Sequence, residues 1–148
     1  MTDLPRSRFS ISFVDVPTTV LPHTQDSLIS WLDALSGVYE KAIGNLHYHL
    51  CSDEHLLELN KQHLDHHDLT DILTFPYSYS PIEAEVFIST DRARDNATSL
   101  GVGYEEELLR LFAHGFLHMS GFDDKGEEDK SRMRTAEDNC IKLYFTHE

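Results

Sequence analysis

Two histidines, His114 and His118, stand four residues apart in the stretch FAHGFLHMSGFDD. On a helix this spacing places both side chains on one face, so the two imidazoles point toward one place and can share a metal ion. Gly121 follows them and permits the left-handed turn that ends a helix. The chain can then fold back and present Asp124, six residues after His118, as a third ligand. The pattern predicts a metal site formed by His114, His118 and Asp124.

The residue after His114 limits the chemistry of such a site. The spacing of the three candidate ligands is that of the metzincin proteases, which carry a glutamate directly after the first histidine as general base. This chain has Gly115 at that place. We therefore expect a metal site without peptide hydrolysis, and a base that comes from elsewhere in the fold. Two alternatives stay open: helical histidines are often satisfied by ordinary partners, and Asp124 with Glu127 can cap the start of the last helix.

The remaining histidines and the two cysteines favour structural interpretations. His47 and His49 alternate with apolar residues, which is typical of the polar face of a sheet. Three more histidines fall in the range 63–67, a polar segment at a helix end, and we interpret it as a solvated loop instead of a second metal site. Cys51 and Cys140 lie far apart in patterned surroundings, which predicts buried, reduced thiols.

Length and charge bound the class of protein. A chain of 148 residues is long enough for one core, so we expect a single domain over residues 1–148. The first residues lack the apolar region of a signal peptide, and no apolar run approaches membrane-spanning length. These features predict a cytoplasmic protein without a membrane partner. The net charge of −14 opposes a protein that grips nucleic acid over its whole surface, and no binding to DNA is expected.

Basic residues nevertheless gather at two places in the sequence. One group follows the histidine motif, and the other opens a predicted helix. A local patch for a polyanion is one interpretation, and ordinary helix charges paired with neighbouring acids are the other. The residues concerned are Lys125, Lys130, Arg132 and Arg134 in the first group and Arg92 and Arg94 in the second.

Hydrophobic periodicity predicts the elements that must position these residues. The helix over residues 104–119 is apolar on several sides and is expected to be central. The predicted strands cover residues 8–14, 46–50, 71–76 and 85–89, with the third stopped at Pro76 and a loop before the fourth. The predicted helices cover residues 26–38, 53–64, 91–100, 104–119 and 127–145. This order predicts an α+β fold, a small mixed sheet packed on a helical layer whose central helix carries the metal ligands.

Two segments together resemble a known family. HGFLHMSGFDD at residues 114–124 resembles the signature HGxLHLxGYDH of the YbeY family, the bacterial endoribonucleases and ribosomal RNA maturation factors. TDILTFP at residues 70–76 resembles that family's TDVLSFP. The pair LeuAsn at residues 59–60 and the strand AEVFIS fall at the family's intervals, so the resemblance extends from about Ser52 to the last helix.

The resemblance implies a specific function. It implies a zinc-binding, single-strand-specific endoribonuclease that acts in 3′-end maturation of small-subunit ribosomal RNA and in ribosome quality control. It also implies one Zn²⁺ per chain and, as partners, ribosomal RNA and the small ribosomal subunit with its proteins. Three departures stand out: Asp124 replaces the third metal histidine, Leu64 replaces an arginine, and Ala84–Glu85 replaces GlyAsp. Another divalent metal would also accept the carboxylate.

The remaining roles follow from this resemblance and from the residue types. Without a glutamate next to His114, Asp123 or Glu85 is the candidate base or water-orienting group. The candidate RNA contacts are Arg92, Lys125, Arg132 and Arg134. One rival interpretation is a non-catalytic ribosome-assembly factor with a structural metal. A second is an iron(II) oxygenase with two histidines and one carboxylate, which the small number of predicted strands disfavours.

Overall fold

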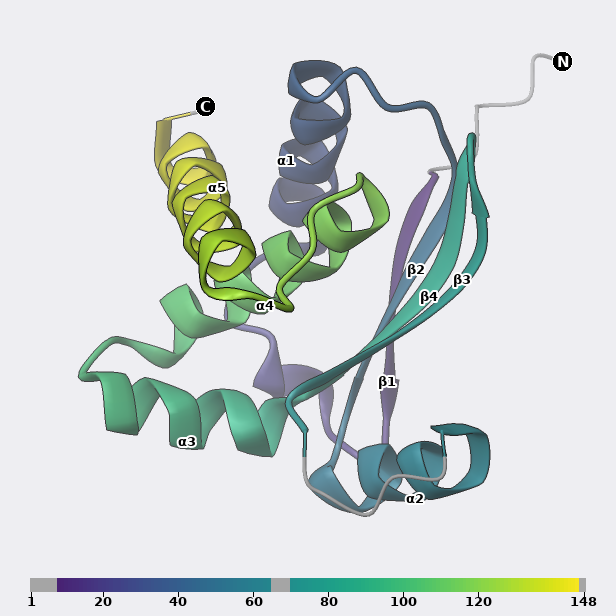
Figure 1. The fold of residues 1–148 in the computed structure, drawn as a ribbon. Helices are drawn as coiled ribbons and strands as arrows, with labels where there is room; N and C mark the ends of the chain where they lie inside the picture. The colour runs from purple at the N-terminus through teal and green to yellow at the C-terminus, as the bar shows by residue number, and fades with distance from the viewer. Residues whose placement is uncertain (1–7, 65–69, 147–148) are drawn as a thin grey trace, which may run out of the picture.

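The computed structural model describes residues 8–64 and 70–146 (Figure 1). The side chains of His63 and Leu64 fall outside this description as well, so the predictions on residues 63–67 are not addressed by it. Strands and helices follow one another in the order expected from the sequence. They are β1 (Phe9–Val14), a 3₁₀ turn (Thr18–Val20), α1 (Gln25–Val38), β2 (Ile43–Cys51), α2 (Asp53–Leu64), β3 (Ile72–Tyr79), β4 (Ile82–Ser89), α3 (Thr90–Leu100), α4 (Tyr104–Met119) and α5 (Glu127–Thr146).

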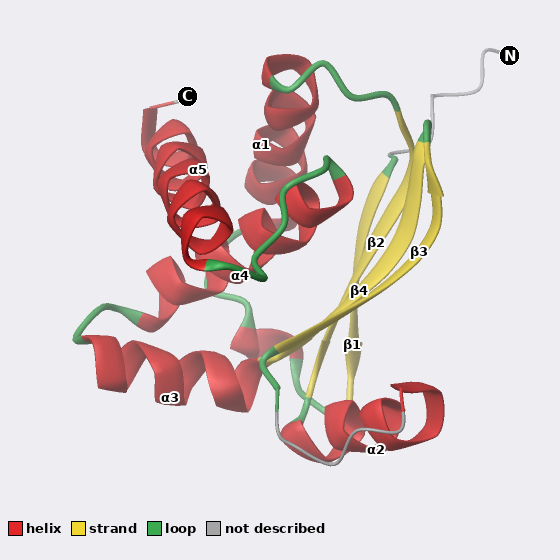
Figure 2. Ribbon diagram, viewed as in Figure 1, coloured by secondary structure: helices red, strands yellow, loops and turns green. Residues whose placement is uncertain are grey.

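The four strands form one mixed sheet in the order β1-β2-β4-β3 (Figure 2). β1, β2 and β4 run parallel, and β3 runs antiparallel to β4. In Figure 1, α1, α4 and α5 lie together on one side of the sheet. The helix α2 does not join this layer. Its Leu56 forms a small, separate apolar cluster with Cys51 and Leu73. The expected α+β class, with a mixed sheet on a helical layer, is confirmed.

The two faces of β2 have different roles. Leu46, Tyr48 and Leu50 are fully buried and belong to the main apolar core. His47 and His49 alternate with them and therefore point to the other face of the sheet, where they stack with ring centroids 4.1 Å apart. The hydroxyl of Ser12 lies 3.0 Å from His47 Nε2 and 2.7 Å from His49 Nδ1. The predicted polar sheet face is confirmed.

β3 is longer than the sequence pattern indicated. It passes through Pro76 and ends at Tyr79, and β4 already begins at Ile82, so residues 80–81 alone connect the two strands. Proline lacks a backbone N–H, but in the described sheet β3 pairs only with β4, and an edge strand tolerates the missing donor. The register shifts directly after Pro76. The predicted strand end and the loop that followed it were wrong.

The helix α4 is central, as expected. Phe112, Phe116 and most of its other apolar residues are buried, and the hydroxyl of Tyr48 donates to the carbonyl of Phe112 at 2.8 Å. Gly115 faces the sheet: a Cβ at this position would lie 2.9 Å from Val86 Cγ1. The helix can approach β4 this closely because Gly115 has no side chain, which also explains why a catalytic glutamate cannot follow His114 here.

The end of α4 turns the chain back as the sequence predicted. Gly121 has a φ of 112°, a backbone conformation that favours glycine. The N–H of Gly121 donates to the carbonyl of His118 at 3.2 Å, and the N–H of Phe122 donates to the carbonyl of Leu117 at 3.0 Å. This pair of bonds is the Schellman arrangement that closes a helix. It brings the following residues, Asp124 included, back beside the last turn of α4.

Both cysteines are free and buried, which confirms the prediction of reduced thiols. Burial raises the pKa of Cys51 to about 12 and that of Cys140 to about 11, so both thiols stay protonated at neutral pH. None of the helices in residues 8–64 and 70–146 combines the length and apolar character that crossing a bilayer requires.

Candidate metal and catalytic site

A cavity of about 540 Å³ lies between the start of β3 and the helices α3, α4 and α5. We name it the central cavity. All three predicted metal ligands, His114, His118 and Asp124, are part of its wall. Arg134, one of the predicted RNA contacts, lines it as well. The fold therefore brings four of the predicted site residues together around one space.

The ring of His114 is held in a defined orientation. Its Nδ1 lies 2.8 Å from Oε2 of Glu137, whose side chain is only 8% exposed. A carboxylate only accepts hydrogen bonds, so Nδ1 carries the proton and a neutral ring has its lone pair on Nε2. Nε2 in turn lies 3.4 Å from Oδ2 of Asp124. The nitrogen available to a metal ion thus faces the carboxylate predicted to share that ion.

Electrostatics around His114 are dominated by carboxylates. Burial lowers the pKa of His114, but the hydrogen bond from the ring to Glu137 and the negative charges of Glu137 and Asp124 raise it more. The pKa therefore lies above its ordinary value. The other oxygen of Glu137 accepts from Arg110 at 3.1 Å, and Arg110 also donates to Asp138 at 2.8 Å. Arg110 thus fixes Glu137, and Glu137 fixes His114.

The donor set fits a borderline divalent metal ion. Imidazole nitrogens and a carboxylate oxygen are ligands that zinc accepts, and a carboxylate behind a ligand histidine is the usual support of such a site. Among the described residues, no three or more His, Cys, Asp or Glu side chains are close enough together to hold a metal ion in their present orientations. His114 and Asp124 already face each other, and His118 occupies the next turn of α4 on the cavity wall.

Glu85, a predicted catalytic residue, lies away from the central cavity. It points to the opposite face of the sheet from Ala84, beside the stacked histidines. Oε2 accepts from the hydroxyl of Tyr77 at 2.6 Å, and Oε1 lies 2.9 Å from His49 Nε2. The hydrogen bond from Tyr77 is the largest of the effects that lower the pKa of Glu85. Its neighbourhood is a separate cavity of about 380 Å³.

Asp123 and Arg132 share another depression, of about 360 Å³, at the turn after α4. Arg132 is 67% exposed and lies 3.6 Å from Glu128 and 3.7 Å from Asp129. This arrangement matches the interpretation of paired helix charges. Lys125 is exposed and follows Asp124 directly. These residues lie along the chain segment next to the central cavity but do not form its wall.

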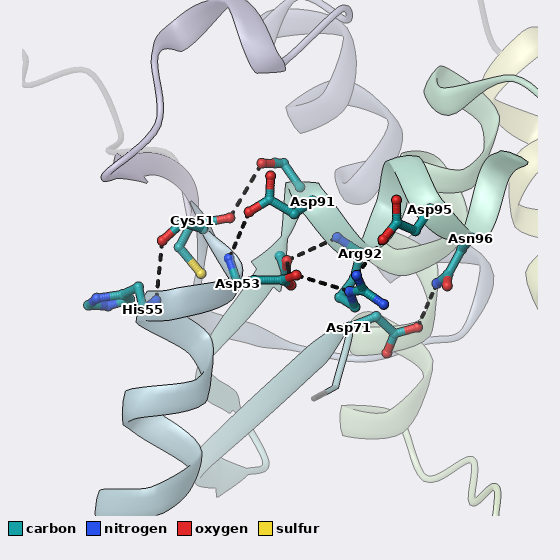
Figure 3. Close-up of polar contacts among 11 residues, drawn as sticks. Cys51, Asp53, His55, Asp71, Asp91, Arg92, Asp95 and Asn96 are labelled. Carbon is teal, nitrogen blue, oxygen red and sulfur yellow. Dashed lines mark hydrogen bonds and ion pairs between the residues drawn. The ribbon is translucent and has the colours of Figure 1, made fainter. Parts of the chain in front are cut away.

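Arg92 belongs to a polar network at the junction of α2, β4 and α3 (Figure 3). Its Nε donates to Oδ2 of Asp53 at 3.1 Å, and its guanidinium also contacts Asp95. The hydroxyl of Ser89 donates to the other oxygen of Asp53 at 2.6 Å. Arg92 is thus engaged in joining three elements and is not among the residues that line the central cavity.

Glu137 is a site residue that the sequence pattern alone did not reveal, because its charge suggested only a partner for basic side chains. A usable signal was present, since Glu137 falls within the inward stripe of α5 that Met133, Cys140 and Ile141 define. A charged residue on an apolar stripe needs a buried partner, and here that partner is a candidate ligand. Other polar residues of the cavity wall were also missed: Asp71, Asn96, Glu107 and Arg110.

Comparison with known proteins identifies the family. The family model described as endoribonuclease YbeY matches residues 14–144. A protein of that name from Flavobacterium psychrophilum is 40% identical over 121 residues, which cover 81% of this chain and 86% of the relative. Another from Cytophaga hutchinsonii is 41% identical over 116 residues, covering 77% of this chain and 81% of the relative.

A solved structure supports the fold independently. The solution structure of a Thermotoga maritima protein matches with a TM-score of 0.62 at 22% identity, covering 94% of this chain and 90% of that chain. The extent of the family match and the identity to named relatives confirm the resemblance found in the two sequence motifs. The chain belongs to the YbeY family of endoribonucleases.

Proposed function

We propose that the protein is a metal-dependent endoribonuclease that cuts single-stranded RNA and matures the 3′ end of small-subunit ribosomal RNA. Its relatives are named endoribonucleases, which favours catalysis over a non-catalytic role in ribosome assembly. The observation that carries the proposal is the orientation of His114. Glu137 holds Nδ1, and Nε2 faces Asp124 across 3.4 Å in a cavity that also contains His118.

The proposed metal is one zinc ion per chain, held by His114, His118 and Asp124. Other divalent ions accept the same two imidazoles and one carboxylate, so the ligand set alone does not exclude them. When bound, the ion supplies a Lewis acid that activates water and offsets the charge of a phosphate.

The chain's own residues position the substrate around that ion. Arg134 lines the cavity and makes no ion pair with a described residue, so its guanidinium is free to bind an RNA phosphate. Asp123, next to the proposed ligand Asp124, is proposed to orient the attacking water. Lys125 extends the RNA contact beyond the cavity, whereas Arg132 faces Glu128 and Asp129 and is assigned little of it. Glu85 and Arg92 are left out of the proposal, because each is bonded at a separate place.

The proposed setting is the cytoplasm, with the small ribosomal subunit and its proteins as partners. The net charge of −14 repels RNA at long range, so contact has to be local. Proteins of the ribosomal subunit would then supply part of the affinity for the substrate. Their contribution would allow an acidic nuclease to act on a polyanion.

Purified protein tests the proposal directly. Protein prepared without chelator should contain about one zinc per chain by elemental analysis and should cleave a single-stranded RNA oligonucleotide. Cleavage of the same sequence in a duplex should be much slower. His118→Ala should lose both zinc and cleavage, whereas His55→Ala, a histidine of α2 outside the cavity wall, should keep both.

A chelator separates catalysis from a structural metal role. Removal of the ion should abolish cleavage while the thermal unfolding transition stays cooperative, because the core consists of apolar residues from helices and sheet. Metal-loaded protein that binds RNA but never cleaves it would contradict the proposal.

A further inference from the structure

One carboxylate in the central cavity has an unmet bonding requirement. Glu107, in the first turn of α4, is 4% exposed, and its Oε1 is buried without a hydrogen-bond partner in the described structure. Buried polar atoms are nearly always bonded, because leaving one unpaired costs free energy. Burial raises the pKa of Glu107, although the hydrogen bond from Asn96 acts in the opposite direction. An unpaired, deeply buried carboxylate oxygen indicates a missing partner.

The side-chain amide of Asn96 also contacts a second carboxylate, that of Asp71. Nδ2 of Asn96 donates to Oδ2 of Asp71 at 3.1 Å and to Oε2 of Glu107 at 3.4 Å. The three side chains come from the segment before β3, from α3 and from α4, and all three line the central cavity. Figure 3 shows the amide of Asn96 directed at Asp71. The N–H groups of one amide thus stand between two acidic groups.

Among the described residues, the cationic groups that act on these carboxylates are Arg110 and the ring of His114, and both hydrogen-bond to other acids. The guanidinium of Arg110 lowers the pKa of Glu107 through its charge, but its hydrogen bonds go to Glu137 and Asp138. Arg92, beside Asn96 in Figure 3, is bonded to Asp53 and Asp95 instead. A neutral amide is a weak substitute for a cation between two carboxylates.

We propose that Asp71, Asn96 and Glu107 form a second cation site, for a hard divalent ion of the Mg²⁺ class. Carboxylate and amide oxygens are the ligands such ions prefer, and Mg²⁺ keeps several waters when few protein ligands are present. Rotation of the Asn96 amide by half a turn replaces its N–H groups with Oδ1 as a third oxygen ligand. The ion would bind Glu107 Oε1, which has no hydrogen-bond partner, and would offset the negative charges of Asp71 and Glu107.

This site lies in the same cavity as the histidine site but shares no ligand with it. Glu107 precedes His114 by seven residues on α4, which corresponds to about 10 Å along the helix axis. Asp71 lies nearer to His114 than Glu107 does, and its charge raises the pKa of His114, so we assign the second ion to the same bound strand and not to the bond cleavage itself. Its role, which rests on the proposed function, is to hold the phosphate of a neighbouring nucleotide through its waters. Ion binding itself needs no RNA.

Mn²⁺ provides the test, because its paramagnetic signal reports binding directly. Zinc-loaded protein, without RNA, is titrated with Mn²⁺ and followed by electron paramagnetic resonance. One Mn²⁺ per chain should bind and should be displaced by excess Mg²⁺. Glu107→Gln and Asp71→Asn should each weaken binding roughly 10- to 100-fold while the zinc content stays unchanged. Asn96→Asp, which adds a third carboxylate, should strengthen binding.

Matched variants separate a built site from a general effect of negative charge. Glu105→Gln removes the same charge from the same helical turn at an exposed position and should bind Mn²⁺ as the parent does. His118→Ala should also keep Mn²⁺. The proposal is overturned if the parent binds no Mn²⁺, if Glu107→Gln and Glu105→Gln bind equally, or if His118→Ala loses the ion while Glu107→Gln keeps it. A failure of RNA cleavage would contradict the proposed function and leave this site unaffected.

Discussion

A single carboxylate decides how His114 can act. An unsupported histidine exchanges its proton between two nitrogens and turns about its side-chain bonds. Glu137 removes both freedoms, because its Oε2 lies 2.8 Å from Nδ1 and its Oε1 is tied to Arg110. The ligand nitrogen is therefore oriented before any ion arrives. Such support is usually worth a factor of ten or more in metal affinity.

Replacement of Glu137 by glutamine tests this support. Glu137→Gln keeps the size of the side chain but removes the charge that holds the proton on Nδ1. Zinc affinity, measured by competition with a chromophoric chelator, should fall roughly 10- to 100-fold. Asp138→Asn is the control, since Asp138 binds the same arginine but is 59% exposed, whereas Glu137 is the residue that bonds His114. Equal zinc affinity in both variants would show that Glu137 has no positioning role.

The burial of Glu107 leads to a separate prediction about how the stability of the protein depends on pH. Its pKa is raised in the folded state by burial, so the folded protein holds this proton more tightly than the unfolded chain does. Stability without divalent ions should therefore fall as pH rises from the ordinary value of 4.5 to the raised pKa, and stay lower above it. Glu107→Gln should be more stable than the parent at pH 7, by on the order of 1 kcal/mol.

Thermal unfolding in chelator at several pH values measures that difference. The gap between Glu107→Gln and the parent should close as the pH falls below about 4, where the glutamate becomes protonated in both states. A gap that stays constant from pH 4 to pH 8 would assign the effect to packing and not to charge.

At the scale of elements, the sequence predicted what depends on local pattern. The helix over 104–119, the glycine turn at Gly121 and the alternating faces of β2 follow from periodicity and backbone freedom, and all were confirmed. The error at Pro76 has a non-local cause, because a proline ends a strand only where a neighbour needs its N–H. Whether β3 is an edge strand depends on the sheet order, which the local pattern does not contain.

Replacement of Gly115 by alanine tests how closely α4 packs against the sheet. Alanine has the better helix propensity, by about 1 kcal/mol. In Gly115→Ala, however, the new methyl group would meet Val86 Cγ1 at 2.9 Å and Cγ2 at 3.3 Å. Overpacking of this kind costs about 1–3 kcal/mol, so the variant should be less stable than the parent in urea unfolding.

A double-mutant cycle tests whether contact with Val86 causes the loss of stability in Gly115→Ala. Val86→Ala removes the two methyl groups that the new side chain meets, so the combined variant should be more stable than the sum of the single effects predicts. Additive effects would show that α4 and β4 have room between them, and that Gly115 is not needed for their approach.

At the scale of the whole molecule, the central cavity shows what sequence reasoning cannot reach. Its wall joins Asp71, Asn96, Glu107 and Glu137, which are separated by up to 66 positions in the chain. The local pattern of each residue gives no sign that the four share one site, although Glu137 falls on the inward stripe of α5. Only the packing of α3, α4 and α5 beside the start of β3 makes them neighbours. The histidine motif was visible because its partners lie within eleven residues of one another.

The same packing separates two arginines that lie close together in the sequence. Arg134 lines the central cavity, whereas Arg132, two residues earlier on α5, lies near Glu128 and Asp129 and faces another depression. Because the molecule carries a net charge of −14, RNA binding must depend on a few local cations. Arg134→Gln should therefore weaken binding to single-stranded RNA, and Arg132→Gln should change it little.

Salt dependence distinguishes a phosphate contact from a general charge effect. Removal of one phosphate contact should reduce the slope of log affinity against log salt concentration by about 0.7 for a single strand. Fluorescence anisotropy with a labelled RNA oligonucleotide, on protein in which Asp123→Asn slows cleavage, gives both affinity and slope. Arg134→Gln should show the reduced slope and Arg132→Gln the parental one. If the two variants behave alike, the overall charge of α5 governs RNA binding, and the position of Arg134 in the cavity wall has no special role.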